Sequence, residues 1–344
     1  MQRLFSTRSP RTSSPSAFTT ARATRRRFLA YCGAATLAAL AGGEAHAQTW
    51  PERSLTIVVP YPAGGGTDVV SRMLAASMSN DLGRSIVIEN RPGASATIGV
   101  RRVVQAEPDG YTVVMLTDVS TVTAASGDTT IDMRKDLIYI GQVVSVPLIL
   151  VANGQAPFKT FPEFVAYAKA NPGKLTAASI GPTSTHHLGL EWLKSLLGID
   201  MLVVPYRGVA PGLTALVAGE IQLMFMGSGV ADAYVANGQL NYLGVGSKTR
   251  MKKLPNVPSI SEFNLPDFEL VSWYGMAAPA NTPQPIVDRW AKTIEKALAD
   301  PVTHDRVAAT GADPVFIPAA DFTRKIQNEI VKFSKIGRDA GMWK

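Results

Sequence analysis

The chain is poor in cysteine: among its 344 residues only Cys32 is a thiol. Cys32 lies in an N-terminal segment that we expect to be removed on export, so the mature chain would have no disulfide and no thiol chemistry. A lipoprotein signal would place small residues before its cysteine. Tyr31 precedes Cys32, so we do not expect lipidation.

Apolar runs long enough to span a membrane are also missing. Arg25-Arg-Arg27 precedes an apolar stretch from Phe28 to Ala41, and Ala45-His-Ala47 has the small-x-small pattern of a cleavage site. This pattern predicts that residues 1–47 are a signal peptide of the twin-arginine type. The stretch is shorter than the roughly 20 residues that span a bilayer, which disfavours a membrane anchor. No later segment has an uninterrupted apolar run of spanning length, so we expect a soluble mature protein.

The mature chain lacks an excess of charge. The whole chain has 34 Lys and Arg against 27 Asp and Glu, a net charge of +7. Residues 1–47 hold seven arginines and one acid, which leaves 27 basic and 26 acidic residues. The pI of about 9.5 is therefore largely a property of the leader. We expect no nucleic-acid partner.

A glycine turn between a strand and a helix is the most informative feature of the mature chain. The β-branched run 55–60 predicts a buried parallel strand, and Gly64, Gly65 and Gly66 form the turn after it. Thr67 or Asp68 would cap a helix over 67–79. The helix start would offer free N–H groups and a positive dipole end to a carboxylate or phosphate. The turn matches neither a P-loop nor G-x-G-x-x-G, so a turn without a ligand remains an alternative.

The rest of the mature chain alternates between β-branched runs and helical patterns, which predicts an α/β protein with mostly parallel sheets. Expected strands are 85–89, 111–117, 175–180, 201–205, 221–226 and 241–246; expected helices are 96–106, 161–170, 186–197, 211–218, 284–299 and 319–339.

Two long apolar segments, Ile138–Val151 and Glu269–Ala278, are candidates for paired strands that cross between two lobes. A cleft would lie between such lobes. Ligands in open α/β sheets bind at the carboxyl ends of strands, where the 61–68 turn lies in the first lobe. The hydroxyl-rich turn 180–186 has the same position in the second lobe, so we expect the two turns to face one another.

Six short motifs occur in order along this part of the chain: Trp50–Asp68, Glu89–Gly93, Pro108–Thr112, Val204–Gly208, Leu254–Pro258 and Trp273–Gly275. Together they resemble the periplasmic substrate-binding proteins of tripartite tricarboxylate transporters, also called Bug receptors. The resemblance extends from about Trp50 to the end of the chain.

The resemblance implies a two-lobed periplasmic binding protein of type II, a Venus flytrap that binds a small organic acid and delivers it to an integral-membrane permease. We expect lobe 1 to comprise residues 48–150 and 277–344, and lobe 2 residues 151–276. It implies no cofactor, and we expect a monomer that is not an enzyme. Where the family often has Asn-Arg-Pro-Gly-Ala-Gly-Gly-Asn, this chain has Ser and Ala in place of the glycines at 95 and 96, which puts any family contact from that loop in doubt.

Carried over to this chain, the resemblance implies ligand contacts from both turns, and neighbouring positions complete the candidate set. The candidate ligand-binding residues are Tyr61, Ala63, Gly64, Gly65, Thr67, Asp68, Thr117, Thr183, Ser184, Thr185, His186, Tyr206, Arg207 and Phe225.

Several of these residues have a structural alternative. For Asp68 the favoured role is to cap the helix, because an acid beside an anion site would repel the ligand. His186 and His187 point about 100° apart on a helix and lack a nearby third ligand, so no metal is expected. Arg207 could form a bidentate pair with a ligand carboxylate or, as we favour, with a structural acid.

An aromatic dicarboxylate is a hypothesis for the ligand, motivated by Tyr61, Tyr206, Phe225 and Trp273. Trp273 and Tyr274 could equally pack at the hinge. The turns show no basic cluster, which favours neutral donors and water as the groups that bind the acid.

Two other functions remain open. A sensor subunit presenting its ligand-bound form to a membrane signalling protein would use the same closure. An exported hydrolase could use the glycine turn as an oxyanion hole, although the chain has no G-x-S-x-G nucleophile elbow.

Overall fold

The computed structural model describes residues 50–128 and 130–343. From Pro51 onward the described residues form one compact unit. The predicted signal peptide and Cys32 lie outside the described residues. Among the helices that are described, none combines the length and the apolar character needed to cross a bilayer.

One group of strands contains the N-terminal βα units. β1 pairs in parallel with β2 and with β3, and antiparallel strands extend the sheet beyond them. The strands and helices of this group are β1 (Leu55–Val59), α2 (Gly66–Leu82), β2 (Ile86–Asn90), α3 (Thr97–Val104), β3 (Thr112–Thr117), α4 (Asp118–Ala125), α9 (Gln284–Ala299), α10 (Pro301–Ala309), β10 (Asp313–Pro318) and α11 (Ala319–Asp339).

The second group repeats this pattern. β5 pairs in parallel with β6 and with β7, and β8 pairs antiparallel with β4. Its elements are α5 (Phe161–Ala170), β5 (Leu175–Ser179), α6 (Thr185–Leu197), β6 (Met201–Pro205), α7 (Val209–Ala218), β7 (Leu223–Gly227), α8 (Ser228–Ala236), β8 (Leu240–Val245) and the short 3₁₀ helix η1 (Ile260–Glu262).

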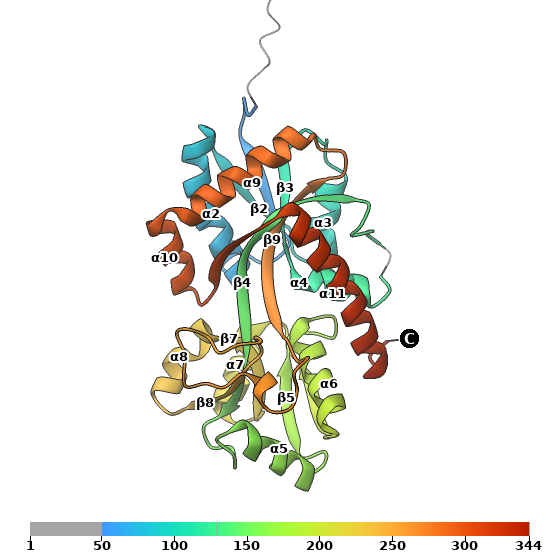
Figure 1. The fold of residues 1–344 in the computed structure, drawn as a ribbon, viewed down its shortest axis with the longest axis vertical. Coiled ribbons are helices and arrows are strands. Elements are labelled where there is room, and N and C mark those ends of the chain that lie inside the picture. Colours follow the sequence, from blue (N-terminus) through green and yellow to red (C-terminus); the bar gives the residue numbers. More distant parts are fainter. Residues whose placement is uncertain (1–49, 129, 344) are drawn as a thin grey trace, which may run out of the picture. The chain divides into compact units, whose positions relative to one another are not determined.

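Two long antiparallel strands, β4 (Leu137–Asn153) and β9 (Val271–Pro279), run between the groups, as Figure 1 shows. β4 pairs with β9 up to Pro147 and with β7 from Leu148 onward. The prediction of an α/β fold with two crossing strands is therefore confirmed. The sheets are not mostly parallel as expected, because every pairing of β4 and β9 is antiparallel. The lobe boundaries at 151 and 276 remain a prediction, and α11, assigned to lobe 1, packs against both α4 and α6.

Side chains alternate between the two faces of β9. Trp273 is fully buried and packs edge-on against Phe322 of α11, with ring centroids 4.9 Å apart. Ser272 and Tyr274 point the other way, toward Asp118 and Thr67. β9 thus has one face for the core and one for polar contacts.

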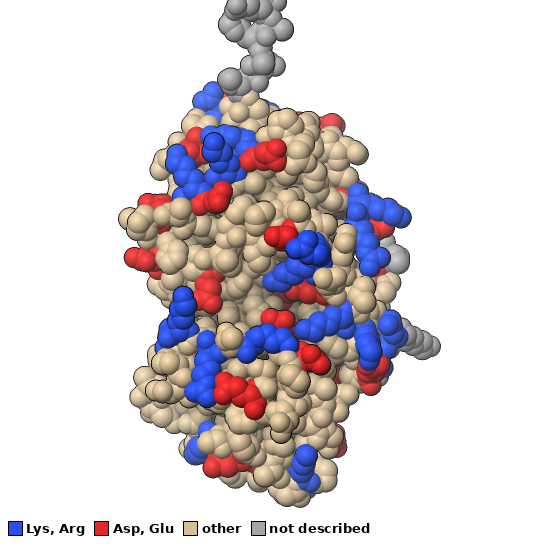
Figure 2. Space-filling model, viewed as in Figure 1, with Lys and Arg blue, Asp and Glu red and all other residues tan. Residues whose placement is uncertain are grey.

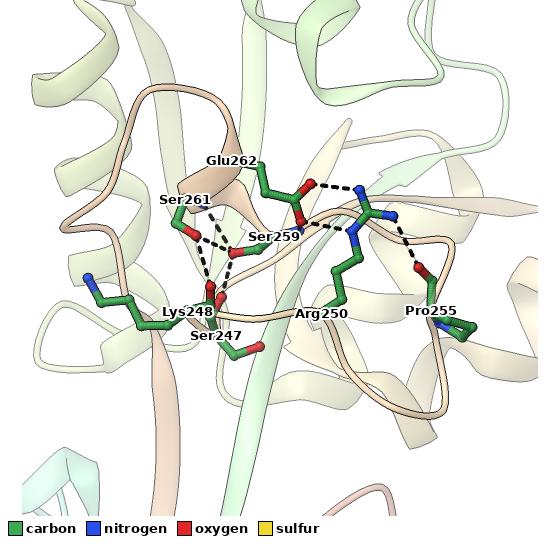
Figure 3. Close-up of polar contacts among 7 residues, drawn as sticks. All are labelled: Ser247, Lys248, Arg250, Pro255, Ser259, Ser261 and Glu262. Atoms are coloured by element: carbon green, nitrogen blue, oxygen red, sulfur yellow. Dashed lines mark hydrogen bonds and ion pairs between the residues drawn. The ribbon is translucent and has the colours of Figure 1, made fainter.

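The loop between β8 and β9 contains the motif Leu254–Pro258 and is held by polar contacts within itself (Figure 3). Arg250 forms a bidentate pair with Glu262, at 2.8 and 2.6 Å. Ser259 caps η1 and donates to Ser247 O at 2.5 Å. The contacts in this loop are structural.

Basic and acidic side chains are interspersed on the face drawn in Figure 2. This distribution agrees with the nearly balanced charge expected for the mature chain.

Five elements were not predicted: α4, α8, η1, α10 and β10. α4 contains one Ser, two Thr and two Val, which have low helix propensity, and α8 begins with Ser-Gly. The prediction that a helix ends before Pro301 was correct, since α9 ends at Ala299. Pro301 also begins α10, with Asp300 as its N-cap, and this second helix was missed.

Candidate functional site

The predicted glycine turn links β1 to α2. α2 begins at Gly66, and its N-cap is Gly65 rather than Thr67 or Asp68. The expected N-cap was therefore wrong by two or three residues. Gly64 has a φ of 81°, a left-handed conformation that favours glycine.

Asp68 closes this turn from the first turn of α2. Its carboxylate accepts hydrogen bonds from Gly64 N and Asn90 Nδ2, both at 2.9 Å, and from Arg72 Nε at 3.0 Å. Burial opposes ionisation, but these bonds outweigh it and lower the pKa of Asp68 below its ordinary value. Asp68 is only 2% exposed, so its role is structural, but it closes the glycine turn and does not cap α2 as predicted.

Only part of the turn backbone is free to bind an anion. The Gly64 amide donates to Asp68, and Gly65 N donates to Pro62 O at 3.4 Å. The amides of Gly66 and Thr67 are the first of α2 and have no preceding helical carbonyl to bond. The positive end of α2 is therefore presented by these two amides. Ala63, Gly64 and Gly65 are exposed.

Two tyrosine hydroxyls lie near this helix end. Tyr274 hydrogen-bonds with the Thr67 side chain, and a Cβ on Gly66 would lie 3.1 Å from the Tyr274 hydroxyl. Tyr61 hydrogen-bonds with Thr117. Burial raises the pKa of both phenols, so both stay neutral at physiological pH and can donate.

Asp118, which sequence reasoning missed, lies next to this group. It begins α4, is 3% exposed, and accepts hydrogen bonds from the hydroxyls of Thr185 on α6 and Ser272 on β9. Burial raises the pKa of Asp118. Its position at the carboxyl end of β3 is a signal that could have pointed to it.

These contacts join residues of both strand groups. We name the set the central polar cluster; it comprises Tyr61, Thr67, Thr117, Asp118, Thr185, Ser272 and Tyr274.

The hydroxyl-rich turn before α6 also meets the first group. Thr183 Oγ1 lies 2.9 Å from Ser95 Oγ, in the loop where this chain departs from the family pattern. Ala94, Ser95 and Ala96 all have positive φ, at 47°, 49° and 76°. The structure therefore brings the second turn against Ser95 and Asp118.

The Ser184 hydroxyl is already occupied by a helix cap. It accepts from His187 N at 3.1 Å and donates to Gly181 O at 2.6 Å. The side chain was predicted to contact the ligand, but these bonds use its donor. Its role is to fix the start of α6.

Ser184→Ala is expected to lower the free energy of unfolding by about 1 kcal/mol, because an orphaned amide at the helix start loses its partner. Urea unfolding measures this. Ser195→Ala is the matched control on the same helix, at an exposed serine, and should change stability by less than about 0.5 kcal/mol. Equal losses in the two variants would contradict the capping role.

The two histidines differ in environment. His186 is 8% exposed, forms no hydrogen bond with another described side chain, and has a pKa lowered to about 4 by burial. His187 Nδ1 lies 3.0 Å from Ser179 Oγ, but Ser179 is fully buried, so this pair offers no accessible nucleophile. No group of three potential metal ligands occurs in the described part of the chain.

Three predicted residues lie apart from the central polar cluster. Phe225 is fully buried and stacks with Phe268 in the core, with centroids 6.2 Å apart, so its assignment to the ligand site was wrong. Arg207 is exposed and forms no ion pair with a described acid, so the favoured structural pairing was wrong too. Tyr206 is half-buried against a core cluster. With Trp273 also in the core, the hypothesis of an aromatic dicarboxylate ligand loses two of the four side chains that motivated it.

The chain matches the family described as "Tripartite tricarboxylate transporter family receptor" over residues 70–342. A curated relative, the protein BugT of Bordetella pertussis, is 30% identical over 321 residues, covering 92% of this chain and 98% of its own length.

Solved structures agree with this match. The periplasmic binding protein BugD is 32% identical, with a TM-score of 0.76 over 86% of this chain and all of BugD. The R. palustris protein Rpa4515, solved with adipate, is 30% identical, with a TM-score of 0.77 over 85% of this chain and 98% of that one.

Proposed function

The chain belongs to the tripartite tricarboxylate transporter family of receptors, and we propose that it binds a small organic carboxylate between its two lobes and delivers it to an integral-membrane permease. The central polar cluster carries this proposal. Its residues come from the turn after β1 and from α2, β3, α4, α6 and β9, and hence from both strand groups and a crossing strand.

The ligand carboxylate would lie at the start of α2. The amides of Gly66 and Thr67 and the hydroxyls of Tyr61 and Tyr274 are neutral donors near one another. Each hydrogen bond to a charged group contributes roughly 1.5–3 kcal/mol. Two or three such bonds, with the helix dipole, suffice for binding in the micromolar range.

Closure of the lobes would trap the ligand and form the surface that the permease recognises. The periplasm is the proposed location, as it is for BugD. The paired arginines before Phe28 favour export by the twin-arginine route.

Thermal unfolding of the purified protein against a library of mono- and dicarboxylates tests the proposal. A ligand at 100 times its Kd should stabilise the protein by about 2.7 kcal/mol, whereas sugars and cationic compounds should not. Stabilisation by sugars or cations alone, with no response to any carboxylate, would refute the proposal.

Gly66→Ala provides a matched variant for any carboxylate that binds. Its methyl group would lie 3.1 Å from the Tyr274 hydroxyl and crowd the free end of α2. Gly66 lies in a helix, where alanine is favoured over glycine, so stability should not fall. We expect a loss of affinity of about tenfold without a loss of stability. Unchanged affinity would place the ligand elsewhere.

A further inference from the structure

Two of the hydrogen bonds that join the strand groups differ in their position. In the first, the Thr185 hydroxyl donates to Asp118, which also accepts from Ser272 on the crossing strand β9. In the second, Ser95 Oγ lies 2.9 Å from Thr183 Oγ1. The first contact is buried, whereas the second is exposed. The Ser95–Thr183 contact therefore lies at the surface of the molecule.

The distance from the crossing strands decides how far each contact moves if the strand groups separate. In the strand order β2-β1-β3-β9, β3 lies beside β9, whereas β2 lies three strands away. Neighbouring strands are about 4.8 Å apart, so β2 lies roughly 14 Å from β9. Asp118 follows β3, and Ser95 lies in the loop after β2. Because the crossing strands join the groups, displacement is least there, and opening would break the Ser95–Thr183 contact first.

The loop that presents Ser95 has an unusual backbone. Ala94, Ser95 and Ala96 all lie in the left-handed region, with φ values of 47°, 49° and 76°. Glycine adopts this region without cost, whereas a residue with a Cβ does not. Such strain is retained where the surrounding structure imposes it, and it clusters at functional positions. Serine at residue 95 therefore has a conformational cost that glycine would avoid, and what it adds is the hydroxyl.

The packing of α3 fixes this loop. Ala96, the N-cap of α3, is 3% exposed. A Cβ on Gly99 would lie 2.8 Å from Pro60 Cα and 2.9 Å from Arg91 O, so the first turn of α3 packs directly on the backbone at the end of β1 and at the start of the loop. Ser95 is the exposed residue between these fixed points. Its hydroxyl is therefore held in place before it bonds to Thr183.

The turn that contains Thr183 is fixed as well. The backbone amide and the hydroxyl of Ser184 both donate to Gly181 O, at 3.1 and 2.6 Å. Ser184 also caps α6. Thr183 lies inside this closed turn and is half-buried. Two hydroxyls on turns that are already ordered lose little conformational freedom when they bond, which strengthens the contact between them.

We propose that Ser95 and Thr183 form a latch between the two lobes, which favours the closed form of the receptor and slows the release of its ligand. This inference rests on the lobe closure of the proposed function, and it adds a contact that involves no ligand atom. A net hydrogen bond of ordinary strength changes an equilibrium by about three- to tenfold. The apparent affinity and the lifetime of the complex should change with the closed fraction.

Four single variants separate the hydroxyl from the backbone strain. Ser95→Ala and Thr183→Val each remove one hydroxyl of the latch, whereas Ser95→Gly removes a hydroxyl and the strain together. Ala94→Gly is the matched control, because it relieves the same strain one residue away and keeps both hydroxyls. Stopped-flow tryptophan fluorescence measures release of adipate, malate, succinate or citrate, whichever binds. We expect release to be about three- to fivefold faster in the first three variants and unchanged in Ala94→Gly.

The double variant of Ser95→Ala with Thr183→Val tests whether the two residues act as one contact. Its release should be no faster than that of the faster single variant. Effects that multiply would mean that Thr183 acts on the ligand directly, and they would overturn the latch. Wild-type release in both single variants would overturn it too. Thr183→Ser keeps a hydroxyl and should retain the wild-type rate.

Small-angle X-ray scattering of the ligand-free protein gives a second readout, which separates this inference from the proposed function. Ser95→Ala and Thr183→Val should have a larger radius of gyration than wild type and Ala94→Gly, because the open form gains population. If none of the four acids binds, the receptor proposal fails and scattering alone decides: larger radii support the latch, and equal radii overturn it. Thermal unfolding of each variant checks that it is folded.

Discussion

Asp68→Ala should lower the free energy of unfolding by about 3 kcal/mol and weaken carboxylate binding at least about tenfold. The carboxylate holds the glycine turn through Gly64 N and Asn90 Nδ2 and pairs with Arg72. Its removal leaves two partly buried donors without an acceptor, and each such loss costs roughly 1–3 kcal/mol. The free amides at the start of α2 lose their fixed position at the same time. Urea unfolding and calorimetry measure the two effects.

Arg72→Ala is the control for the ion pair alone. The Arg72 side chain is 52% exposed, so water replaces its contribution and the loss should stay below about 1 kcal/mol. A loss as large in Arg72→Ala as in Asp68→Ala would show that the turn contacts are unimportant.

The effect of Asp68→Ala should also depend on pH. Hydrogen bonds lower the folded-state pKa of Asp68 below 3.8, so its ionised form stabilises the fold above the unfolded-state pKa. That contribution is lost as pH falls through the folded-state pKa. The difference between wild type and variant should be constant at neutral pH and shrink below about pH 4. A gap that widens on acidification would contradict this assignment.

Local patterns were sufficient to predict the strand, turn and helix around Asp68. The apolar run, the glycines and the helical spacing all lie within about 30 residues, so residues close in sequence determine this local structure. The crossing strands were predictable for a similar reason, because their apolar runs are unusually long. The exact N-cap of α2 was not predictable, since it depends on which backbone carbonyl accepts the first helical hydrogen bond.

Asp118 could not be predicted in this way. Its partners Thr185 and Ser272 lie 67 and 154 residues away in the chain, and no short-range pattern encodes such a contact. Phe225 was misassigned for the opposite reason. Alternation along β7 shows that some side chains face the core, but only the packing of α5 and α6 on the sheet decides which residues form that core.

The motif Trp273–Gly275 has a physical explanation that neither local pattern nor ligand binding supplies. Gly275 lies on β9 opposite Gln142 of β4. A Cβ at this position would lie 2.3 Å from Phe322 Cζ and 3.1 Å from Gly141 O. Phe322 is fully buried, so α11 packs on the crossing strands only because residue 275 has no side chain.

Gly275→Val should therefore destabilise the protein by about 3 kcal/mol or more, since overpacking a dense core forces side chains and backbone to shift. Urea unfolding measures the loss. Gly275→Ala should give a smaller loss in the same direction.

A compensating variant separates two explanations for the loss. One is steric overlap with Phe322, and the other is the smaller backbone freedom of any residue other than glycine at position 275. Phe322→Leu alone should cost about 1–3 kcal/mol through lost packing. Combined with Gly275→Val it should relieve the overlap, so that the double variant is at least about 1 kcal/mol more stable than the two single losses predict. Strict additivity would mean that α11 does not press on residue 275, and the close packing of α11 on β9 would then not be the reason for a glycine in this motif.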